Sequence, residues 1–493
     1  MRPAILGIAL CCYLHAQKLP FDVQALMKIA RISDPQISPD GRTVVFTAQT
    51  IDIENNKRPK RIYTVSVDGG TPRAVSPAEA SCERARWSPD SRRLAFVSDQ
   101  GGSSQIWIMD AGGGSARQVT NVSTEASGVL FSPDGKNVLF TSDVYPECPD
   151  DACNRAKLEA EKANKVKARI YTSLLYRRWN EWRGKRRTHL LIAPVVGGAA
   201  RDLTPGDRDA PPFALGGPDG YSISPDGNEV CYVANPDEVP ATSTNTELYV
   251  VPAAGGAVKK ITMNPGADTA PQYSPDGKYL AWLAQFRSGY ESDRWRLLVL
   301  DRATGRLTNL TENLDRWVSS FAWAPDSARL FFTTQDRGRQ AIQFIPVTGG
   351  ATRIAVSGKS QLDDMQFTRD GKTMIYTEQS GASPIEIFRA SSTGGSALPL
   401  TRMNDDALAP YQLTALEDFH VEGAEKTQVH GFLVKPPNFQ RDKKYPVLML
   451  IHGGPQGEWG ENWTYRWNAQ VFAAAGYVVV MPNIRGSVGY GQK

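Results

Sequence analysis

Short stretches of alternating apolar and polar residues recur along most of the chain, and the same four-residue turn introduces each of them. The first copy is Ser38–Gly41, and the apolar strand Val44–Phe46 follows it. Pro fixes φ at the first corner of a type I turn, Asp accepts backbone hydrogen bonds, and Gly takes the left-handed exit. Full or near-full copies begin at Ser38, Ser88, Ser132, Ser224 and Ser274, and weaker ones at Ala324 and Thr368.

A second landmark accompanies each copy: an alternating strand, a Gly pair or its equivalent, and a further strand that ends near Thr. Gly113-Gly114 and Gly255-Gly256 are examples. Both landmarks occur seven times, at intervals of 44–50 residues apart from one gap of 92. Four short strands in such a period are typical of a propeller blade. The pattern therefore predicts an all-β, seven-bladed propeller from about Asp34 to Thr401. A β-solenoid or a β-sandwich is the alternative.

The long gap predicts an insertion of about residues 144–187 within the third blade. Its middle, Asn154–Arg169, is rich in Ala, Lys and Glu and is expected to be helical. Twelve Lys or Arg stand against three Glu from Arg155 to Arg187, with aromatic residues between them. We consider two interpretations: an arm over the propeller face that contacts substrate, or a solvated helix with aromatic anchors. Nucleic acid is not an expected partner of this segment.

Composition places the chain among ordinary globular proteins, with 41% hydrophobic and 22% charged residues and a net charge of only +4. Residues 1–16 resemble a secretory signal, with Arg2, an apolar run over Ile5–Leu14, and Ala16 before the cut. A lipoprotein site at Cys11 or Cys12 is the alternative. Export permits disulfides, and Cys148 and Cys153 are close enough in sequence to form a local bridge. We expect Cys82 and Cys231 to be buried free thiols, and no run is long enough for a transmembrane helix.

The pattern changes after about Tyr411. Leu413–Val421 and Gln428–Lys435 read as an antiparallel hairpin. The continuous apolar run Tyr445–Ile451 predicts a strand that is buried on both faces. A Gly-rich loop, a helix over Trp463–Ala475 and a second buried strand, Tyr477–Met481, complete a βαβ unit.

The loop of this unit, His452-Gly453-Gly454-Pro455, is the candidate chemical element. In α/β-hydrolases, a loop of H-G-G type after the third strand supplies a backbone N–H to the oxyanion hole. Glycine there lets the backbone approach the developing negative charge, and such a donor lowers the barrier by about 3 kcal/mol. Two glycines alone are a moderate signal, and the preceding propeller strengthens it.

Taken together, the chain resembles the prolyl oligopeptidase family of serine peptidases, closest to its dipeptidyl-peptidase 5 and acylaminoacyl-peptidase-like branch. Five segments carry the resemblance: the opening Ile32–Gly41, Tyr176–Trp182 in the insertion, His452–Gln456, Tyr465–Asn468 and Asn483–Gly491. The resemblance implies a propeller joined to an α/β-hydrolase domain, with His452, Gly453 and Gly454 as the oxyanion loop. It implies no metal and no organic cofactor. The implied partners are short peptides or unfolded N-termini, not nucleic acid or a membrane span.

The family's nucleophile lies in a G-x-S-x-G elbow, and this sequence contains no such pentapeptide. We therefore expect Ser, Asp and His of the triad after Lys493, and we expect these 493 residues to be an inactive, C-terminally truncated fragment. His189, His420 and His430 are expected to be structural. The candidate substrate-pocket residues are Trp463, Tyr465 and Arg485, although packing in the core for the two aromatic residues, and ordering of a turn for Arg485, is the simpler explanation.

We accordingly divide the chain into a signal peptide (1–16), a seven-bladed propeller (17–410) and an incomplete hydrolase domain (411–493). The expected protein is a periplasmic or secreted serine peptidase that releases N-terminal dipeptides from short peptides. Acylaminoacyl peptidase and oligopeptidase specificities stay open, and so does a homo-oligomeric state. The alternative from another class is a non-catalytic, TolB-like propeller that serves as a binding or scaffold protein.

Overall fold

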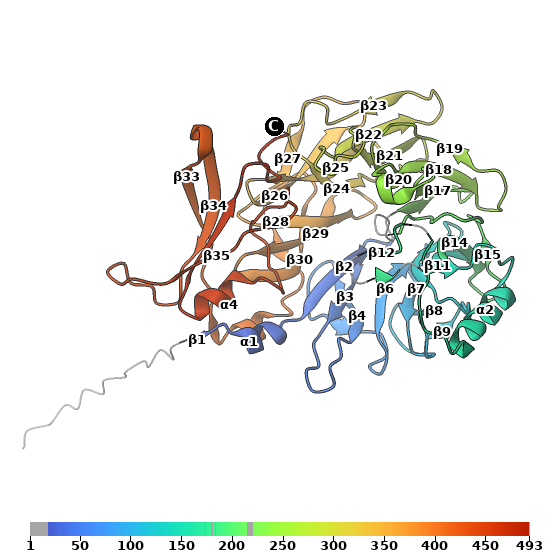
Figure 1. The fold of residues 1–493 in the computed structure, drawn as a ribbon, viewed down its shortest axis with the longest axis horizontal. Helices are drawn as coiled ribbons and strands as arrows, with labels where there is room; N and C mark the ends of the chain where they lie inside the picture. The colour runs from blue at the N-terminus through green and yellow to red at the C-terminus, as the bar shows by residue number, and fades with distance from the viewer. Residues whose placement is uncertain (1–17, 173, 179–180, 183, 214–219, 493) are drawn as a thin grey trace, which may run out of the picture.

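The computed structural model of the chain describes residues 18–172, 174–178, 181–182, 184–213 and 220–492. The predicted signal peptide lies outside these residues. Groups of antiparallel strands fan around a common centre to form a propeller, and a separate C-terminal sheet lies at one side (Figure 1). No helix among the described residues is long and apolar enough to cross a membrane.

The propeller consists of antiparallel four-strand groups, and in every group but the third, which the insertion interrupts, the strands follow one another in sequence. The first two are β2 (Arg31–Ile37), β3 (Thr43–Gln49), β4 (Lys60–Ser66), β5 (Arg73–Ala74), and β6 (Cys82–Trp87), β7 (Arg93–Ser98), β8 (Gln105–Asp110), β9 (Arg117–Gln118). The next two are β10 (Ser127–Phe131), β11 (Asn137–Val144), β14 (Arg187–Pro194), β15 (Arg201–Asp202), and β16 (Tyr221–Ile223), β17 (Glu229–Ala234), β18 (Glu247–Pro252), β19 (Lys259–Lys260).

The remaining groups are β20 (Asp268–Tyr273), β21 (Tyr279–Ala284), β22 (Arg296–Asp301), β23 (Leu307–Asn309); then β24 (Val318–Trp323), β25 (Arg329–Asp336), β26 (Arg339–Pro346), β27 (Arg353–Val356); and β28 (Gln361–Phe367), β29 (Thr373–Ser380), β30 (Ser383–Ser391), β31 (Leu398–Pro399). A single parallel pair, Gln340 with Gln361, joins the last two groups into one sheet. A short 3-10 helix, Pro240–Thr242, precedes β18.

The repeated turn works as its sequence predicts. At the first copy the Gly41 N–H donates to the Ser38 carbonyl over 2.8 Å, and the Ser38 hydroxyl donates to the Asp40 carboxylate over 2.5 Å. Gly41 has φ of +74°, the left-handed conformation that favours glycine. These bonds join residues only two or three apart, so the sequence alone is enough to specify the turn.

The Thr near the end of five of the periods also has a defined role. Its hydroxyl accepts a hydrogen bond from a backbone N–H of the third strand, fourteen residues earlier. This bond recurs, at 2.8–2.9 Å, as Ile106 to Thr120, Leu190 to Thr204, Leu248 to Thr262, Leu297 to Thr311 and Ile387 to Thr401. The short fourth strand is thereby fixed to the third even where their ladder is only two residues long.

The first and last strand groups pack against each other without exchanging a strand. Ile32, Val44 and Phe46 share an apolar cluster with Ile375 and Ile387. Gln366 adds a polar link, since its side chain accepts from the Ile37 N–H over 2.9 Å and donates to the Pro35 carbonyl over 3.1 Å. The buried Asn404 side chain further holds Ala30 through two hydrogen bonds of 2.8 and 3.0 Å. Side-chain packing and these amides therefore connect the two ends of the propeller.

The insertion lies between β11 and β14 of the third group, where the long gap in the repeat predicted it. Its helix, α2 (Asp151–Ala163), begins three residues before the predicted start at Asn154 and ends six residues before the predicted end at Arg169. The Asp150 carboxylate sets this start, because it accepts from the Cys153 N–H over 2.9 Å. A short ribbon, β12 (Arg177–Arg178) with β13 (Glu181–Trp182), follows.

The aromatic residues of the insertion pack on one another. Tyr171 lies 4.9 Å from Tyr176 and 5.9 Å from Trp182 between ring centroids, and the Arg169 guanidinium lies 4.8 Å from the Trp182 centroid. Trp182 is still 49% exposed. The insertion leaves its group between the second and third strands, and it therefore starts on the propeller face where the equivalent hairpins of other groups contact the C-terminal sheet. We propose that the insertion is either an arm over the propeller face that contacts substrate or a solvated helix with aromatic anchors.

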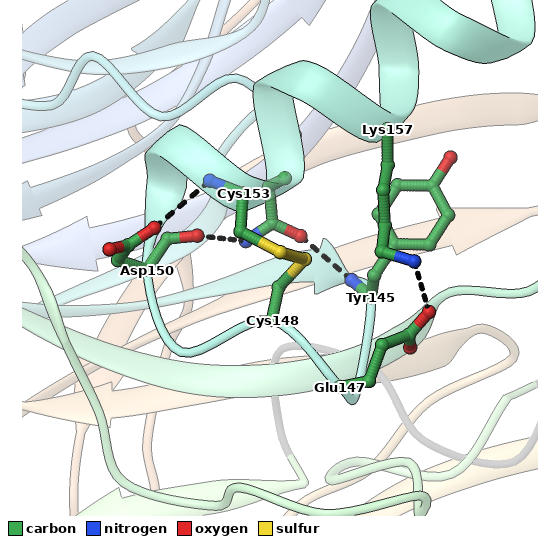
Figure 2. The surroundings of a disulfide bond; sticks show 7 residues. Tyr145, Glu147, Cys148, Asp150, Cys153 and Lys157 are labelled. Atoms are coloured by element: carbon green, nitrogen blue, oxygen red, sulfur yellow. Dashed lines mark hydrogen bonds and ion pairs between the residues drawn. A yellow bond between two sulfur atoms is a disulfide. The ribbon is translucent and has the colours of Figure 1, made fainter.

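Cys148 and Cys153 form a disulfide at the start of α2 (Figure 2). Around it, Asn154 accepts from the Tyr145 N–H over 2.8 Å, and Lys157 pairs with Glu147 at 2.6 Å. The bridge and these bonds hold the loop 145–150 against the first turn of the helix. Cys82 and Cys231 are free and buried, as expected.

Replacing both Cys148 and Cys153 by serine is expected to lower the free energy of unfolding by about 2 kcal/mol, because the bridge closes a loop of sequence separation only 5. Urea unfolding of the variant and the wild type, each with and without reductant, measures this. The variant should not respond to reductant, whereas the wild type should fall to the level of the variant. A wild type that is equally stable in reductant would contradict the prediction.

The C-terminal sheet has the order β33 (Glu417–Glu422), β34 (Gln428–Val434), β36 (Val478–Asn483), β35 (Val447–Met449). β33 and β34 form the predicted hairpin around a 3-10 turn, Ala424–Lys426, and β35 pairs in parallel with β36. Before the sheet, β1 (Leu19–Pro20) pairs with β32 (Tyr411–Gln412), next to α1 (Val23–Met27) and α3 (Asp405–Leu408).

Two expectations for this segment are wrong. The run Tyr445–Ile451 is not buried on both faces: in the described residues β35 pairs on one side only, and Val447, Met449 and Ile451 are 62%, 56% and 69% exposed. The helix does not span Trp463–Ala475, because α4 covers only Ala469–Ala474. The Asn468 side chain accepts from the Gln470 N–H and starts the helix there.

Candidate active site

The loop after β35 makes a tight turn that depends on glycine. Gly454 has φ of +128°, and a Cβ atom there would lie 2.4 Å from the Gln456 nitrogen and 2.6 Å from the Gly457 nitrogen. The Gly457 N–H donates to the Gly453 carbonyl over 3.2 Å and closes the turn. Gly453 has open space around it. The loop therefore presents bare backbone, which is what an oxyanion donor requires.

His452 is held at the start of this loop by a residue that the sequence did not single out as its partner. Its Nε2 lies 2.8 Å from the Ser487 hydroxyl, and the buried Ser487 hydroxyl lies 2.7 Å from the Ile484 carbonyl. A hydroxyl has one proton, and Ser487 donates it to the Ile484 carbonyl, which can only accept. This serine is consequently oriented as a structural acceptor and not as an activated nucleophile.

A cavity of about 400 Å³ lies between the propeller and this loop. Its lining has several amides, one aromatic ring and one carboxyl group, and it includes no Lys or Arg: Trp317, Gln335 and Gln361 come from the propeller, and Gly454, Gln456, Gly457, Glu458, Asn462 and Val488 come from the C-terminal segment. Because Gly454 belongs to both the cavity wall and the glycine turn, a molecule in the cavity would lie beside the candidate oxyanion donors.

Glu458 is the carboxyl group of this wall. Its Oε2 accepts from the Gly338 N–H over 3.0 Å, and its Oε1 is buried without a hydrogen-bond partner. Burial, with a smaller contribution from the negative charge of Asp336, raises the pKa of Glu458 to about 8, although the Gly338 hydrogen bond acts in the opposite direction. The group is therefore largely protonated at neutral pH when the cavity is empty.

Two hairpin tips of the propeller position these residues. Arg337 and Gly338 join β25 to β26: the Arg337 N–H donates to the Gly489 carbonyl over 3.2 Å, and the Gly338 carbonyl accepts from the Glu461 N–H over 2.7 Å. At the tip between β29 and β30, the Gly381 N–H donates to the buried Glu461 carboxylate over 3.2 Å. Glu461 thus contacts both tips and ties the segment around the cavity to the propeller.

A second polar network lies under the same contact. Arg339 donates to both oxygens of Asp418 at 2.9 and 2.8 Å, and this hydrogen bonding holds the pKa of Asp418 below its ordinary value. Asp418 also accepts from His430 Nε2 over 3.0 Å, and His430 Nδ1 faces the Tyr490 hydroxyl. Burial lowers the pKa of His430. With all its partners satisfied in this way, His430 has the structural role expected from the sequence.

The structure places the other sequence-derived candidates away from the cavity lining. Trp463 is buried in an apolar cluster with Phe21 and Ile29, and Tyr465 packs at its edge with the Arg31 guanidinium 4.2 Å from its ring centroid. Arg485 is exposed and pairs with Glu425 at 2.6 Å. The sequence did not single out Glu458 or Trp317, because only the fold brings Trp317 of the propeller, and the hairpin tip at Gly338 that binds Glu458, to the loop.

His189 and His420, which were also expected to be structural, lie in strands. His189 is buried, with Nδ1 2.6 Å from Asp202 and Nε2 2.9 Å from the Gly206 carbonyl. His420 stacks on His430 at 4.9 Å. Among the residues that the structure describes, no group of three or more His, Cys, Asp and Glu side chains is placed to hold a metal ion.

Comparison with known proteins matches both parts of the chain. Residues 22–147 match the TolB beta propeller domain, and residues 463–493 match the prolyl oligopeptidase family. Acylaminoacyl peptidase from Pyrococcus horikoshii superposes with a TM-score of 0.75 at 19% identity, over 96% of this chain and 68% of that one. At that identity the superposition shows a shared fold.

Two curated relatives are more similar in sequence. Dipeptidyl-peptidase 5 of Porphyromonas gingivalis is 33% identical over 477 residues, which is 95% of this chain and 68% of the relative. Dipeptidyl-peptidase 5 of Porphyromonas endodontalis is 30% identical over 478 residues, with the same coverage. Given this extent of similarity, and a glycine turn that faces a cavity at the propeller, the chain belongs to the prolyl oligopeptidase family of serine peptidases.

Proposed function

We propose that this chain is the seven-bladed propeller, about residues 17–410, and the first part of the hydrolase domain, from about residue 411, of a periplasmic or secreted dipeptidyl peptidase. The observation that carries the proposal is that the glycine turn, His452–Gly454, places Gly454 in the wall of the cavity between propeller and C-terminal segment. The relatives named dipeptidyl-peptidase 5 support release of dipeptides as the activity. The seven strand groups support the blade count.

In the proposed reaction, a serine hydroxyl attacks the scissile carbonyl of a short peptide and a histidine carries its proton to the leaving amine. The contribution of this chain is the oxyanion site. Backbone N–H groups of the glycine turn, preorganised by the Gly457-to-Gly453 hydrogen bond, stabilise the negative oxygen of the tetrahedral intermediate. The propeller beside the cavity limits access to short or unfolded peptides.

We place the nucleophile, its acid and its histidine outside these 493 residues. The sequence has no G-x-S-x-G, and the match covers 68% of the dipeptidyl-peptidase 5 relatives. Ser487 lies within hydrogen-bond distance of His452 Nε2, but its hydroxyl donates its proton to the Ile484 carbonyl. The 493 residues alone are then expected to bind peptide without cleaving it.

A fluorophosphonate probe tests this assignment. The 493-residue protein should remain unlabelled, both folded and after heating, whereas a version extended to the length of the relatives should be labelled and should release dipeptides from a peptide with a free N-terminus. Labelling of the 493-residue protein would contradict the placement of the nucleophile. An extended protein that neither labels nor hydrolyses would instead favour the non-catalytic, TolB-like binding role.

A further inference from the structure

The cavity beside the glycine turn has an electrostatic property that the oxyanion chemistry does not require. One carboxyl group, Glu458, faces a wall made otherwise of amides, backbone, Trp317 and Val488. We propose that Glu458 binds a primary ammonium group of a peptide in this cavity, namely its free α-amino group. This inference rests on the proposed peptidase function and identifies Glu458 as the residue that binds the N-terminus of the substrate.

The first argument is that Glu458 has no cationic partner of its own. Its only hydrogen bond among the described residues is with the Gly338 N–H, and none of the ion pairs found among those residues includes it. The carboxylate of Asp336 acts on it as well, and this charge disfavours ionisation of Glu458. An ionised carboxylate that is removed from water is unfavourable unless a cation pairs with it. Glu458 is therefore protonated when no cation is bound.

The second argument is the composition of the rest of the wall. The lining includes no basic side chain that would repel an ammonium group or compete with it. Gln335, Gln361 and Asn462 offer amide donors and acceptors for a short peptide backbone, and Trp317 adds an aromatic ring, a group that attracts cations. A volume of about 400 Å³ is within the range of pockets for small ligands.

The third argument concerns how the carboxyl group is held. The Gly338 N–H fixes one oxygen, and Gly489 leaves room for it, because a Cβ there would lie 2.8 Å from Glu458 Oε2. The other oxygen, Oε1, has no hydrogen-bond partner, so it is the atom that would accept from the ammonium group while Oε2 keeps its bond to the Gly338 N–H.

Binding of an ammonium group to Glu458 changes the number of protons that the protein holds, and this change can be measured. The empty site is Glu458–COOH, and the bound site is Glu458–COO⁻ paired with the ammonium group. Binding of R–NH₃⁺ therefore releases one proton to the buffer, because the pKa of about 8 keeps the empty carboxyl protonated at neutral pH. An uncharged ligand in the same cavity releases none.

Isothermal titration calorimetry on the 493-residue protein at pH 7 tests this with three probes: Ala-Phe-amide, N-acetyl-Ala-Phe-amide and N-acetyl-Lys-amide. Ala-Phe-amide should bind roughly tenfold or more tightly than its acetylated form, and heats in two buffers of different ionisation enthalpy should show proton release for it alone. Equal binding of N-acetyl-Lys-amide, with the same release, would assign the site to lysine side chains instead of the N-terminus. Equal binding of the acetylated dipeptide, or no binding of any probe, would overturn the proposal.

Two variants complete the test. Glu458→Gln keeps an acceptor for the Gly338 N–H and should lose both the preference for the free amine and the proton release. Asp336→Asn removes the neighbouring carboxylate, which lies outside the cavity lining, and should keep the preference. A preference that survives in Glu458→Gln would overturn the assignment. Fluorophosphonate labelling of an extended protein without this preference would reject the inference alone, whereas binding without labelling would reject the peptidase function.

Discussion

Replacing Gly338 by alanine is expected to loosen the C-terminal segment from the propeller at a cost of about 3 kcal/mol. Gly338 has φ of +73°, which costs an alanine about 1 kcal/mol. The added Cβ would also lie 2.5 Å from the Phe432 ring and 2.8 Å from the Trp459 carbonyl, and such overpacking costs about 1–3 kcal/mol. Phe432 is fully buried and cannot withdraw without disturbing the sheet core.

Hydrogen exchange and limited proteolysis of residues 411–492 measure the effect. The variant should show faster exchange and earlier cleavage in this segment, while strands of the first propeller groups keep their protection. Gly305→Ala is the matched control, since Gly305 has nearly the same φ, +74°, and its Cβ would meet nothing within 4 Å. If both variants behave alike, backbone strain and not the contact with Phe432 explains the loss.

Replacing Glu458 by glutamine is expected to raise the stability of the protein at pH 8 while leaving it nearly unchanged at pH 4. The pKa of Glu458 is about 8 in the folded protein, above the ordinary value of 4.5. Between these values the folded state keeps a proton that the unfolded state has released. Wild-type stability therefore falls as pH rises through this window, by at most about 1.4 kcal/mol per pH unit from this group. Glutamine does not titrate and removes this contribution.

Urea unfolding of the wild type and Glu458→Gln at several pH values from 4 to 9 provides the measurement. The difference in free energy of unfolding, variant minus wild type, should grow from about pH 5 and level off above pH 8. Other titrating groups are common to both proteins and cancel in the difference. A difference that does not change with pH would show that Glu458 is ionised in the folded protein.

Local sequence chemistry accounts for most of the propeller. The turn at Ser38–Gly41 and the Thr hydroxyl that holds the fourth strand both join residues at short, fixed separations. Their repetition predicts the strand groups and the insertion between β11 and β14. The start of α2 was missed by three residues because the cap, Asp150, lies before the Ala-rich stretch that suggested a helix.

The same reasoning was less successful in the C-terminal segment. The apolar run at Tyr445–Ile451 has the composition of a doubly buried strand, but composition does not reveal which neighbours a strand has, and β35 pairs on one side. Trp463 and Tyr465 were candidates for the pocket on residue type alone. Their packing with Phe21 and Arg31 depends on the N-terminal helix, about 440 residues away in the chain.

The sequence by itself thus determined the repeat, the insertion and the glycine turn at His452–Gly454, since each follows from bonds and φ values within a few residues. Only the tertiary structure decided what faces that turn. The hydrogen bond from Gly338 to Glu458 spans 120 residues, and the one from His452 to Ser487 spans 35. Contacts of this kind carry no local pattern, because they exist only once the propeller and the C-terminal sheet have been brought together.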